Sequence, residues 1–180
     1  MIKNISLDYD FGTFINADYS VHCGSCIKHQ VYELTDIHEQ FGGFPKSYCL
    51  ENTMIHQLWW TSNQIDYQDL GKQLGMEVIT VSSILQPPGC VIPYHRDTFF
   101  QISQQYPDRK EPKIRANIYL ENYKLGQFIQ YVENDQIHTS VDWRAGDGYI
   151  WDSNILHLSS NAGMQNKYTL QISGFLLTLA

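Results

Sequence analysis

Residues 113–121 read KIRANIYLE, and they carry a pattern that recurs through the C-terminal half of the chain. Apolar side chains stand at Ile114, Ala116, Ile118 and Leu120, with Arg, Asn and Tyr between them. Successive side chains of a β-strand point to opposite faces of its sheet. This period of two therefore predicts a strand with one apolar face and one chemically different face.

Similar runs follow one another from Met76 onward, and Gly, Pro, Asn and Asp separate them. They are short and rich in β-branched and aromatic residues, which is typical of strands. Short antiparallel strands divided by tight turns predict a barrel, a sandwich or a jelly roll. The predicted strands are MEVITVSSIL (76–85), CVIPYH (90–95), KIRANIYLE (113–121), GQFIQYVE (126–133), QIHTSVDW (136–143), GDGYIWD (146–152), ILHLS (155–159) and YTLQISGFLLTL (168–179).

The N-terminal part has a helical texture instead. Apolar residues recur at helical spacing over Ile27–Phe41, and Gly42-Gly43 follows as a stop. A second, shorter helix is expected over Asp66–Leu74, because Asp66 can cap its start and Gly75 can end it. We expect these helices to pack on the outside of a mainly β core.

The composition is that of one folded domain. Of 180 residues, 43% are hydrophobic and only 17% are charged, which is too apolar for a disordered chain. We expect a single domain over residues 1–180. Residues 1–75 would form a support of helices and strands, and residues 76–180 the β-rich catalytic core.

Charge and cysteine content exclude several classes of protein. A net charge of −7 opposes binding to nucleic acids, which needs a surplus of Lys and Arg. The apolar runs are far shorter than the roughly 18 residues of a membrane span, and the N-terminus lacks the basic start of a secretory signal. Four scattered cysteines make no disulfide framework. We therefore expect a cytoplasmic protein that binds neither nucleic acid nor membrane, in an oligomeric state that the sequence leaves open.

Three residues in the β-rich part form a candidate metal site. His95 and Asp97 lie two apart, so an extended backbone points both side chains to one face, and His157 comes from another predicted strand. Two imidazoles and one carboxylate bind one face of a non-haem Fe(II) and leave other positions open. An isolated His-x-Asp pair is also common at surfaces and caps, and a histidine between Leu156 and Leu158 also suits a structural core position.

A basic residue in the last predicted strand strengthens the metal interpretation. Lys167 lies ten residues after His157, and Thr169 follows two residues later. On a strand, these two side chains share a face, where an ammonium and a hydroxyl together can hold a carboxylate.

With these residues the chain resembles the Fe(II)- and 2-oxoglutarate-dependent oxygenases. More closely, residues 82–95, 114–120 and 141–172 resemble the aspartyl/asparaginyl β-hydroxylase-like family, and the resemblance covers about Val78 to Phe175. The residues that match in order are Ser83, Gly89, His95, Arg115, Trp143, Gly146, Asp152, His157, Asn161 and Lys167.

This resemblance implies a double-stranded β-helix core, which is a jelly-roll, cupin-like fold. It implies a dioxygenase that uses Fe(II), 2-oxoglutarate and O₂ to hydroxylate an unactivated C–H bond of an amino acid, a peptide or a related small substrate, releasing succinate and CO₂. The implied iron ligands are His95, Asp97 and His157. The implied contacts to 2-oxoglutarate are Lys167 to the far carboxylate, Thr169 and Ser83 as hydroxyl donors, and Arg115 and Asn117 toward the carboxylate nearest the metal.

Departures from the family leave the substrate open. The family's usual base is Arg, whereas Lys167 resembles prolyl 4-hydroxylases and makes a prolyl hydroxylase-type activity the alternative. Asn117 stands where the family has a second contact, a His. The substrate is a free amino acid, a peptidyl Asp, Asn or Pro, or another small acid. Two rivals of other classes are a metal-binding cupin without 2-oxoglutarate and an inactive barrel that only binds.

Four further features have competing interpretations. Cys23 and Cys26, flanked by histidines, suit either a zinc or redox site or the buried thiols of a helix start, which we favour because no second Cys/His pair follows. Trp59-Trp60 suits a core residue beside a rim aromatic, with substrate stacking as the alternative. Packing and turns account for Trp143, Gly146, Asp152 and Asn161. Residues 98–114 form a predicted lid, and the bases from Arg96 to Arg115 favour an anionic co-substrate and an acidic substrate.

Overall fold

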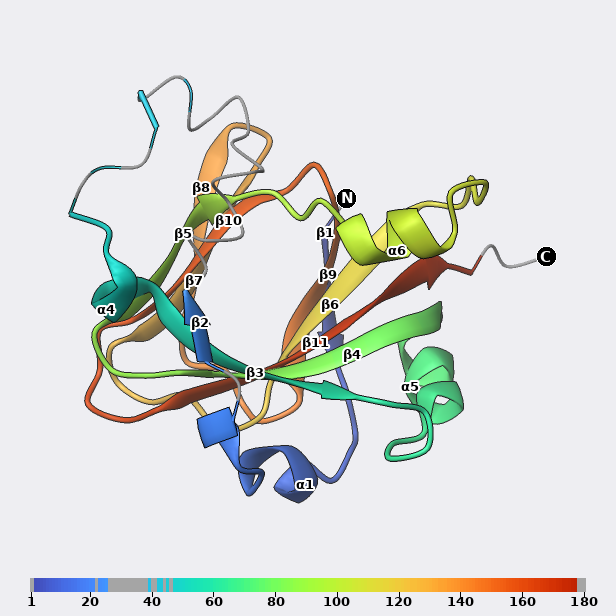
Figure 1. Cartoon of the computed structure of the whole chain (residues 1–180), viewed down its shortest axis with the longest axis horizontal. Coiled ribbons are helices and arrows are strands. Elements are labelled where there is room, and N and C mark those ends of the chain that lie inside the picture. Colours follow the sequence, from blue (N-terminus) through green and yellow to red (C-terminus); the bar gives the residue numbers. More distant parts are fainter. Residues whose placement is uncertain are drawn as a thin grey trace.

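The structure is a computed structural model of the chain, and it describes residues 2–21, 23–25, 39, 42–43, 45 and 47–177 (Figure 1). Its helical segments are short and lie at the edges of the β core. The strands are β1 (Ile2–Ser6), β2 (Cys23–Ser25), β3 (Met54–Trp60), β4 (Met76–Gln86), β5 (Cys90–His95), β6 (Lys113–Tyr119), β7 (Gln127–Glu133), β8 (Gln136–Ser140), β9 (Asp147–Asp152), β10 (Leu156–Asn161) and β11 (Lys167–Leu176). The helical segments are α1 (Gly12–Ile15), η1 (Tyr19–Val21), α4 (Leu50–Thr53), α5 (Tyr67–Leu74) and α6 (Phe100–Gln105).

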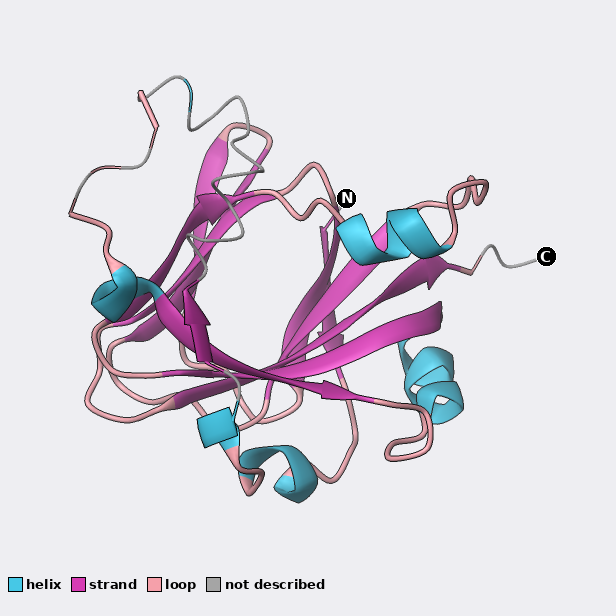
Figure 2. Ribbon diagram, viewed as in Figure 1, coloured by secondary structure: helices cyan, strands magenta, loops and turns pink. Residues whose placement is uncertain are grey.

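The strands of the described residues form two antiparallel sheets that face each other across a barrel-like interior (Figure 2). The seven-stranded sheet has the order β1-β9-β6-β11-β4-β3-β2, and the four-stranded sheet has the order β5-β10-β7-β8. Most neighbours in these orders, such as β1 with β9 and β5 with β10, are distant in sequence, as a jelly roll requires. The predicted class, a mainly β protein with flanking helices and a double-stranded β-helix core, is confirmed.

The alternation that predicted β6 divides the seven-stranded sheet into two faces. Ile114, Ala116 and Ile118 are fully buried on the outer face, in one hydrophobic cluster with Phe14 of α1 and Leu70 of α5. The N-terminal segment and α5 therefore cover this face with apolar contacts. The intervening side chains of β6 point into the interior, where the chemistry is placed.

All eight predicted strands are present, with ends that differ by a few residues. The predicted second helix is confirmed as α5: the Asp66 carboxylate accepts hydrogen bonds from the backbone N–H groups of Gln68 and Asp69, and Gly75 ends the helix in the left-handed conformation. The predicted helix over Ile27–Phe41 lies, except for Glu39, outside the described residues.

The structure adds elements that we did not predict, among them β1, β3 and α6. Residues 54–60 read MIHQLWW, which has no clean alternation of polar and apolar positions, yet they pair with β4 along most of their length. Pairing with neighbouring strands thus decides this segment more than its own pattern does. None of the helices in the described part of the chain combines the length and the apolar character that a membrane crossing needs.

Candidate active site

His95 and His157 meet across the pairing of β5 with β10. They are register partners in the four-stranded sheet, and their ring centroids are 4.2 Å apart. Asp97 follows β5 by two residues, and candidate ligand atoms of the three side chains all lie within 4.8 Å of one another. Asp97 and His157 are buried and His95 is half-buried. The structure therefore brings the three predicted metal ligands together.

Backbone carbonyls fix how the two imidazoles are oriented. His95 Nδ1 lies 2.8 Å from the carbonyl oxygen of Pro93, and His157 Nδ1 lies 3.0 Å from that of Ile155. A carbonyl only accepts hydrogen bonds, so each Nδ1 carries the proton and donates it. Nε2 is then the ring nitrogen of each histidine that can serve as a metal ligand, and this is how metal-binding histidines are usually held.

The carboxylate of Asp97 is held at both oxygens. Arg115 Nη1 donates a hydrogen bond to Oδ1, and Trp151 Nε1 donates to Oδ2 over 2.9 Å. Burial alone would raise the pKa of Asp97, but the guanidinium of Arg115 and the bond from Trp151 outweigh it and bring the pKa to about 2. The carboxylate is therefore ionised at neutral pH, as a metal ligand must be.

His157 is kept in its neutral form by its surroundings. Burial and the neighbouring His95 lower the pKa of His157 to about 3. The Asp97 carboxylate lies 4.0 Å from His157 Nε2, which is too far for a hydrogen bond that would favour a proton there. A neutral His157, a second imidazole and an ionised carboxylate match the donor set of a non-haem Fe(II) site, which leaves the rest of the coordination sphere to other ligands.

A cavity of about 310 Å³ opens beside the triad, between the two sheets. The four-stranded sheet contributes the histidines and Ile129, and the seven-stranded sheet contributes an inner face of mostly uncharged polar side chains. Trp59 and Phe100 keep 51% and 58% of their surfaces exposed at its lining, so they mark where it meets solvent. The interpretation of Trp59-Trp60 as a rim aromatic beside a core residue agrees with this, since Trp60 packs edge-on against Phe14.

Lys167 is the first residue of β11, and its ammonium group lies next to Ser159, which lines the cavity. Only 2% of its surface is exposed, and Nζ donates to the Phe128 carbonyl at 2.8 Å, to Ser159 Oγ at 2.9 Å and to the Ser160 carbonyl at 3.4 Å. Ser159 lines the cavity, whereas Lys167 does not. Burial lowers the pKa of Lys167 to about 7, because no carboxylate of the described residues pairs with it.

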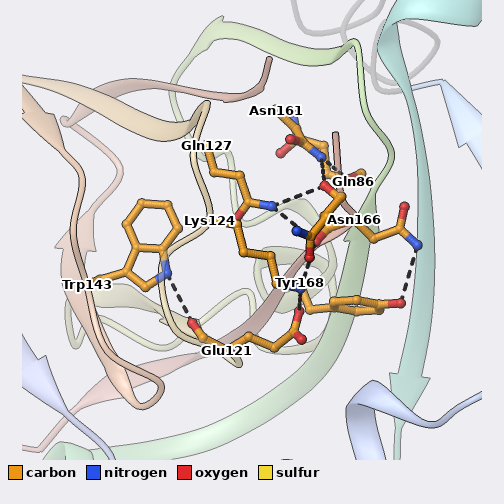
Figure 3. Close-up of polar contacts among 9 residues, drawn as sticks. Gln86, Glu121, Lys124, Gln127, Trp143, Asn161, Asn166 and Tyr168 are labelled. Carbon is orange, nitrogen blue, oxygen red and sulfur yellow. Dashed lines mark hydrogen bonds and ion pairs between the residues drawn. The ribbon is translucent and has the colours of Figure 1, made fainter. Parts of the chain in front are cut away.

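A polar network lies at the strand ends opposite the triad, where β4 and β10 end and β7 and β11 begin (Figure 3). Glu121, the carboxylate in this network, forms an ion pair with Lys124 over 2.6 Å and so does not neutralise Lys167. Asn161 donates to the carbonyl of Gln86 at 2.8 Å, and Trp143 donates to the carbonyl of Glu121 at 3.1 Å. The predicted packing roles of Asn161 and Trp143 fit these contacts.

The other predicted contacts to 2-oxoglutarate divide between the two faces of the sheet. Thr169, Asn117 and Arg115 line the cavity. Ser83 does not: it pairs with Leu170, which belongs to the outer hydrophobic cluster, and its hydroxyl accepts a hydrogen bond from Trp60 Nε1 at 2.9 Å. Its neighbour Ser82 lines the cavity instead, because adjacent residues of a strand face opposite ways.

Arg115 is positioned on Asp97 rather than left open toward a co-substrate. Its Nε donates to Ser173 Oγ at 2.9 Å, and its guanidinium lies 5.3 Å from the centre of the Phe99 ring. Phe99 has φ of 51°, a left-handed conformation that is uncommon for a bulky residue and turns the chain from Asp97 into α6. Sequence reasoning missed Trp151 and Phe99, because their roles depend on contacts between distant segments.

The predicted lid begins as helix α6 and continues in an anchored loop. Arg109 pairs with Glu77 at 2.8 Å and Glu111 at 3.0 Å, and Lys113 donates to Ser103 Oγ at 2.8 Å. Of the five bases in the stretch from Arg96 to Arg115, only the first and the last line the cavity. The structure therefore does not bring the positive charge of this stretch to the cavity as a whole.

The structure does not test the zinc interpretation of the cysteine pair, because Cys26 lies outside the described residues and the side chain of Cys23 is likewise not described. Cys90 is buried, and its thiol donates to the carbonyl of Met54. This is the contact of a packed thiol and not of a metal ligand. Cys49 is exposed at the start of α4.

Comparison with known proteins places the fold. No family model and no curated protein sequence matches the chain. A solved prolyl-4-hydroxylase from Pseudomonas putida is similar over 97% of this chain and 92% of that chain, with 14% identity and a TM-score of 0.57. The non-heme alpha ketoglutarate dependent carbocyclase SnoK from nogalamycin biosynthesis is similar over 67% of this chain and 64% of that chain, with 9% identity and a TM-score of 0.50. At these identities the likeness establishes a shared fold.

Proposed function

We propose that this chain is an Fe(II)- and 2-oxoglutarate-dependent oxygenase that hydroxylates an unactivated C–H bond. The observation that carries the proposal is the triad of His95, Asp97 and His157, whose candidate ligand atoms all lie within 4.8 Å of one another and whose carboxylate is ionised. Three protein ligands on one face leave room for a chelating co-substrate and O₂. When bound there, iron with 2-oxoglutarate and O₂ supplies the oxidation, with release of succinate and CO₂.

The residues around the triad prepare it for the metal. The carbonyls of Pro93 and Ile155 orient the imidazoles, and Arg115 with Trp151 orients the carboxylate. These outer contacts reduce the reorganisation that metal binding would otherwise need. The aromatic walls of Trp151 and Phe99 keep water away from the reacting centre.

Lys167 supports 2-oxoglutarate as the co-substrate. A buried ammonium without a counter-charge is unfavourable, and a carboxylate at the cavity floor beside Ser159 and Thr169 would supply that charge. Asn117 offers a second group, because its Nδ2 is buried and has no hydrogen-bond partner. An unpartnered donor costs roughly 1–3 kcal/mol, which a bound carboxylate oxygen would recover.

For the subtype, we propose a member similar to the aspartyl/asparaginyl β-hydroxylases, on the ordered residues from Gly89 to Lys167. The lysine itself favours the alternative, a prolyl hydroxylase-type activity. Ser83 has no part in either version, since it faces the outer hydrophobic cluster.

Succinate formation tests the proposal. Protein loaded with Fe(II) is expected to convert 2-oxoglutarate to succinate slowly in air without added substrate, and His157→Ala and Asp97→Ala variants are expected not to. A matched control is Asp108→Ala, which removes an exposed carboxylate of the lid loop. Metal binding without any 2-oxoglutarate binding or succinate would favour the cupin alternative, and no metal binding would favour an inactive barrel.

A further inference from the structure

The sheet that faces the two histidines carries uncharged polar side chains that the proposed iron and 2-oxoglutarate contacts do not use. On β3, β4 and β11 these are Gln57, Ser82 and Gln171, and all three line the cavity. They are neighbours in space, because β3 and β11 both pair with β4. Together they form a polar wall, which we define as Gln57, Ser82 and Gln171.

The amides of this wall have unused hydrogen-bonding capacity. Gln57 Nε2 donates to Ser82 Oγ at 2.9 Å, and this fixes the amide and leaves Oε1 without a donor from the described residues. Gln171 also lines the cavity, and within the described part of the chain its amide makes no side-chain hydrogen bond. The wall therefore presents both donors and an acceptor to a ligand.

Two aromatic rings continue the wall toward solvent. Trp59 lies two residues beyond Gln57 on the same face of β3, and Phe100 opens α6. Both rings line the cavity while keeping about half of their surface exposed. Exposed aromatic faces at the mouth of a polar pocket suit stacking against a flat, uncharged group.

The polar wall itself carries no charged group with which to bind an ionic substrate. The lining includes no carboxylate besides the metal-binding Asp97, so none of the described residues is placed there to hold an ammonium group. Arg115 is already paired with Asp97, and Arg96 donates to the carbonyl of Asn154 at 3.2 Å. A free amino acid, which carries both charges, would lose its hydration here without gaining partners.

We propose that the primary substrate enters this cavity as an uncharged, amide-bearing group that hydrogen-bonds to the polar wall and stacks on Trp59. This inference rests on the proposed oxygenase function and narrows its substrate class. An amide supplies one donor and one acceptor, which match Gln57 and Gln171. A free amino acid is disfavoured because the lining offers its ammonium group no carboxylate besides Asp97.

Matched compounds test the charge of the substrate. The probes are proline and asparagine, their N-acetyl methylamides, and the N-acetyl methylamide of aspartate. Binding is measured by ligand-observed NMR on Zn(II)-substituted protein loaded with 2-oxoglutarate, and stimulated succinate formation is measured with Fe(II). At least one uncharged capped compound is expected to bind at least about tenfold more tightly than its free amino acid and than capped aspartate.

Variants test the location. Gln171→Leu and Trp59→Leu are expected to lower the affinity for the capped compound about tenfold, whereas Trp59→Phe is expected to retain most of that affinity. Gln68→Leu, which removes an exposed amide on α5, is the control that leaves it unchanged. Tighter binding of a free amino acid or of capped aspartate, or no binding by any capped compound, would overturn the inference. If capped amides bind but neither 2-oxoglutarate binding nor succinate formation is seen, only the oxygenase proposal would be contradicted.

Discussion

Lys167 is the residue whose environment is most unusual for its type. A lysine that is buried beside carbonyl dipoles, with no carboxylate among the described residues to pair with it, has its pKa lowered to about 7. Such a group loses its proton as the pH rises above neutrality unless an anion arrives. The residue is therefore sensitive both to ligand and to pH.

We predict that Lys167→Met lowers the affinity for 2-oxoglutarate at least about tenfold while metal binding is retained, because the variant keeps the volume and removes the charge. In the wild type, affinity should fall as pH rises above about 7, by up to tenfold per unit, since only the protonated lysine attracts the carboxylate.

Lys167→Arg is the matched control, because a guanidinium stays charged over this range. Its affinity for 2-oxoglutarate, measured by calorimetry on Zn(II)-substituted protein, should vary less with pH than that of the wild type. Equal affinities in the wild type and in Lys167→Met would remove the lysine from its proposed role.

Asp97 is the anionic ligand of the proposed metal site. Asp97→Ala removes the anionic ligand and leaves Arg115 beside two histidines, so we predict a loss of Fe(II) or Co(II) affinity of at least about a hundredfold. Metal titration followed by absorbance checks this, with Asp108→Ala as control. Wild-type metal affinity in Asp97→Ala would show that the triad is not the site.

At the scale of the elements, β11 meets β4 at an irregular step next to Ser173, the residue that pairs with Arg115 of β6. The register shifts between Ser173 and Gly174, and a Cβ on Gly174 would overlap the carbonyl oxygen of Glu77. Glycine is needed here for close approach of two backbones. Ser173, next to this step, accepts a hydrogen bond from Arg115, and Arg115 in turn donates to the Asp97 carboxylate.

We predict that Gly174→Ala lowers the free energy of unfolding by more than the roughly 1 kcal/mol expected for Gly89→Ala. Gly89 has φ of +78°, and a Cβ added there would meet no atom within 4 Å, so its variant reports backbone strain alone. Urea denaturation of both variants makes the comparison. A smaller loss in Gly174→Ala than in Gly89→Ala would contradict the close packing of β4 and β11.

Elements also show what the sequence could predict. The strict alternation of β6 and the capped ends of α5 made both predictable, because local pattern and burial agree there. The ordered spacing of His95, Asp97 and His157 predicted the triad. We expected Ser83 of β4 to face the co-substrate, but Ser82 lines the cavity. The sequence does not say which of two adjacent serines faces inward.

Contacts between segments that are far apart in sequence could not be predicted. Trp151 and Arg115 are register partners in the pairing of β9 with β6, and both side chains donate hydrogen bonds to the Asp97 carboxylate. The positive stretch before β6 suggested a cationic cavity, but Arg109 turns to Glu77 in the fold. Charge counted along the chain therefore does not give the charge of the cavity.

At the scale of the whole molecule, acid should destabilise the metal-free protein through the triad. The pKa of His157 is lowered to about 3, while the unfolded chain binds this proton near pH 6.5. Between these values the unfolded state holds more protons, so stability rises with pH and is lost as pH falls from about 6.5 toward 3.

We predict that His157→Gln reduces this acid-induced loss of unfolding free energy by up to about 1.4 kcal/mol per pH unit, because one titrating group is removed. Urea denaturation of both metal-free proteins at pH 7, 5.5 and 4.5 measures the difference. His138→Gln, which changes a histidine of β8 outside the triad, serves as the control. Parallel curves for wild type and His157→Gln would show that His157 is not held neutral by burial.

The two ends of the barrel have different tasks in this molecule. The end opposite the triad satisfies its polar groups within the protein, as the network around Glu121 and Lys124 shows (Figure 3). The end that holds the triad leaves the buried amide nitrogen of Asn117 without a hydrogen-bond partner among the described residues. This unsatisfied group thus lies where a ligand is expected, and the packed outer face keeps it in place.

Anaerobic addition of 2-oxoglutarate to the Fe(II)-loaded protein tests most directly whether the end that holds the triad is an oxygenase site. We predict a weak visible charge-transfer band that appears with one equivalent of each, persists in Asp108→Ala and is absent in Asp97→Ala. A protein that binds Fe(II) at the triad but develops no band with saturating 2-oxoglutarate would contradict the proposed function.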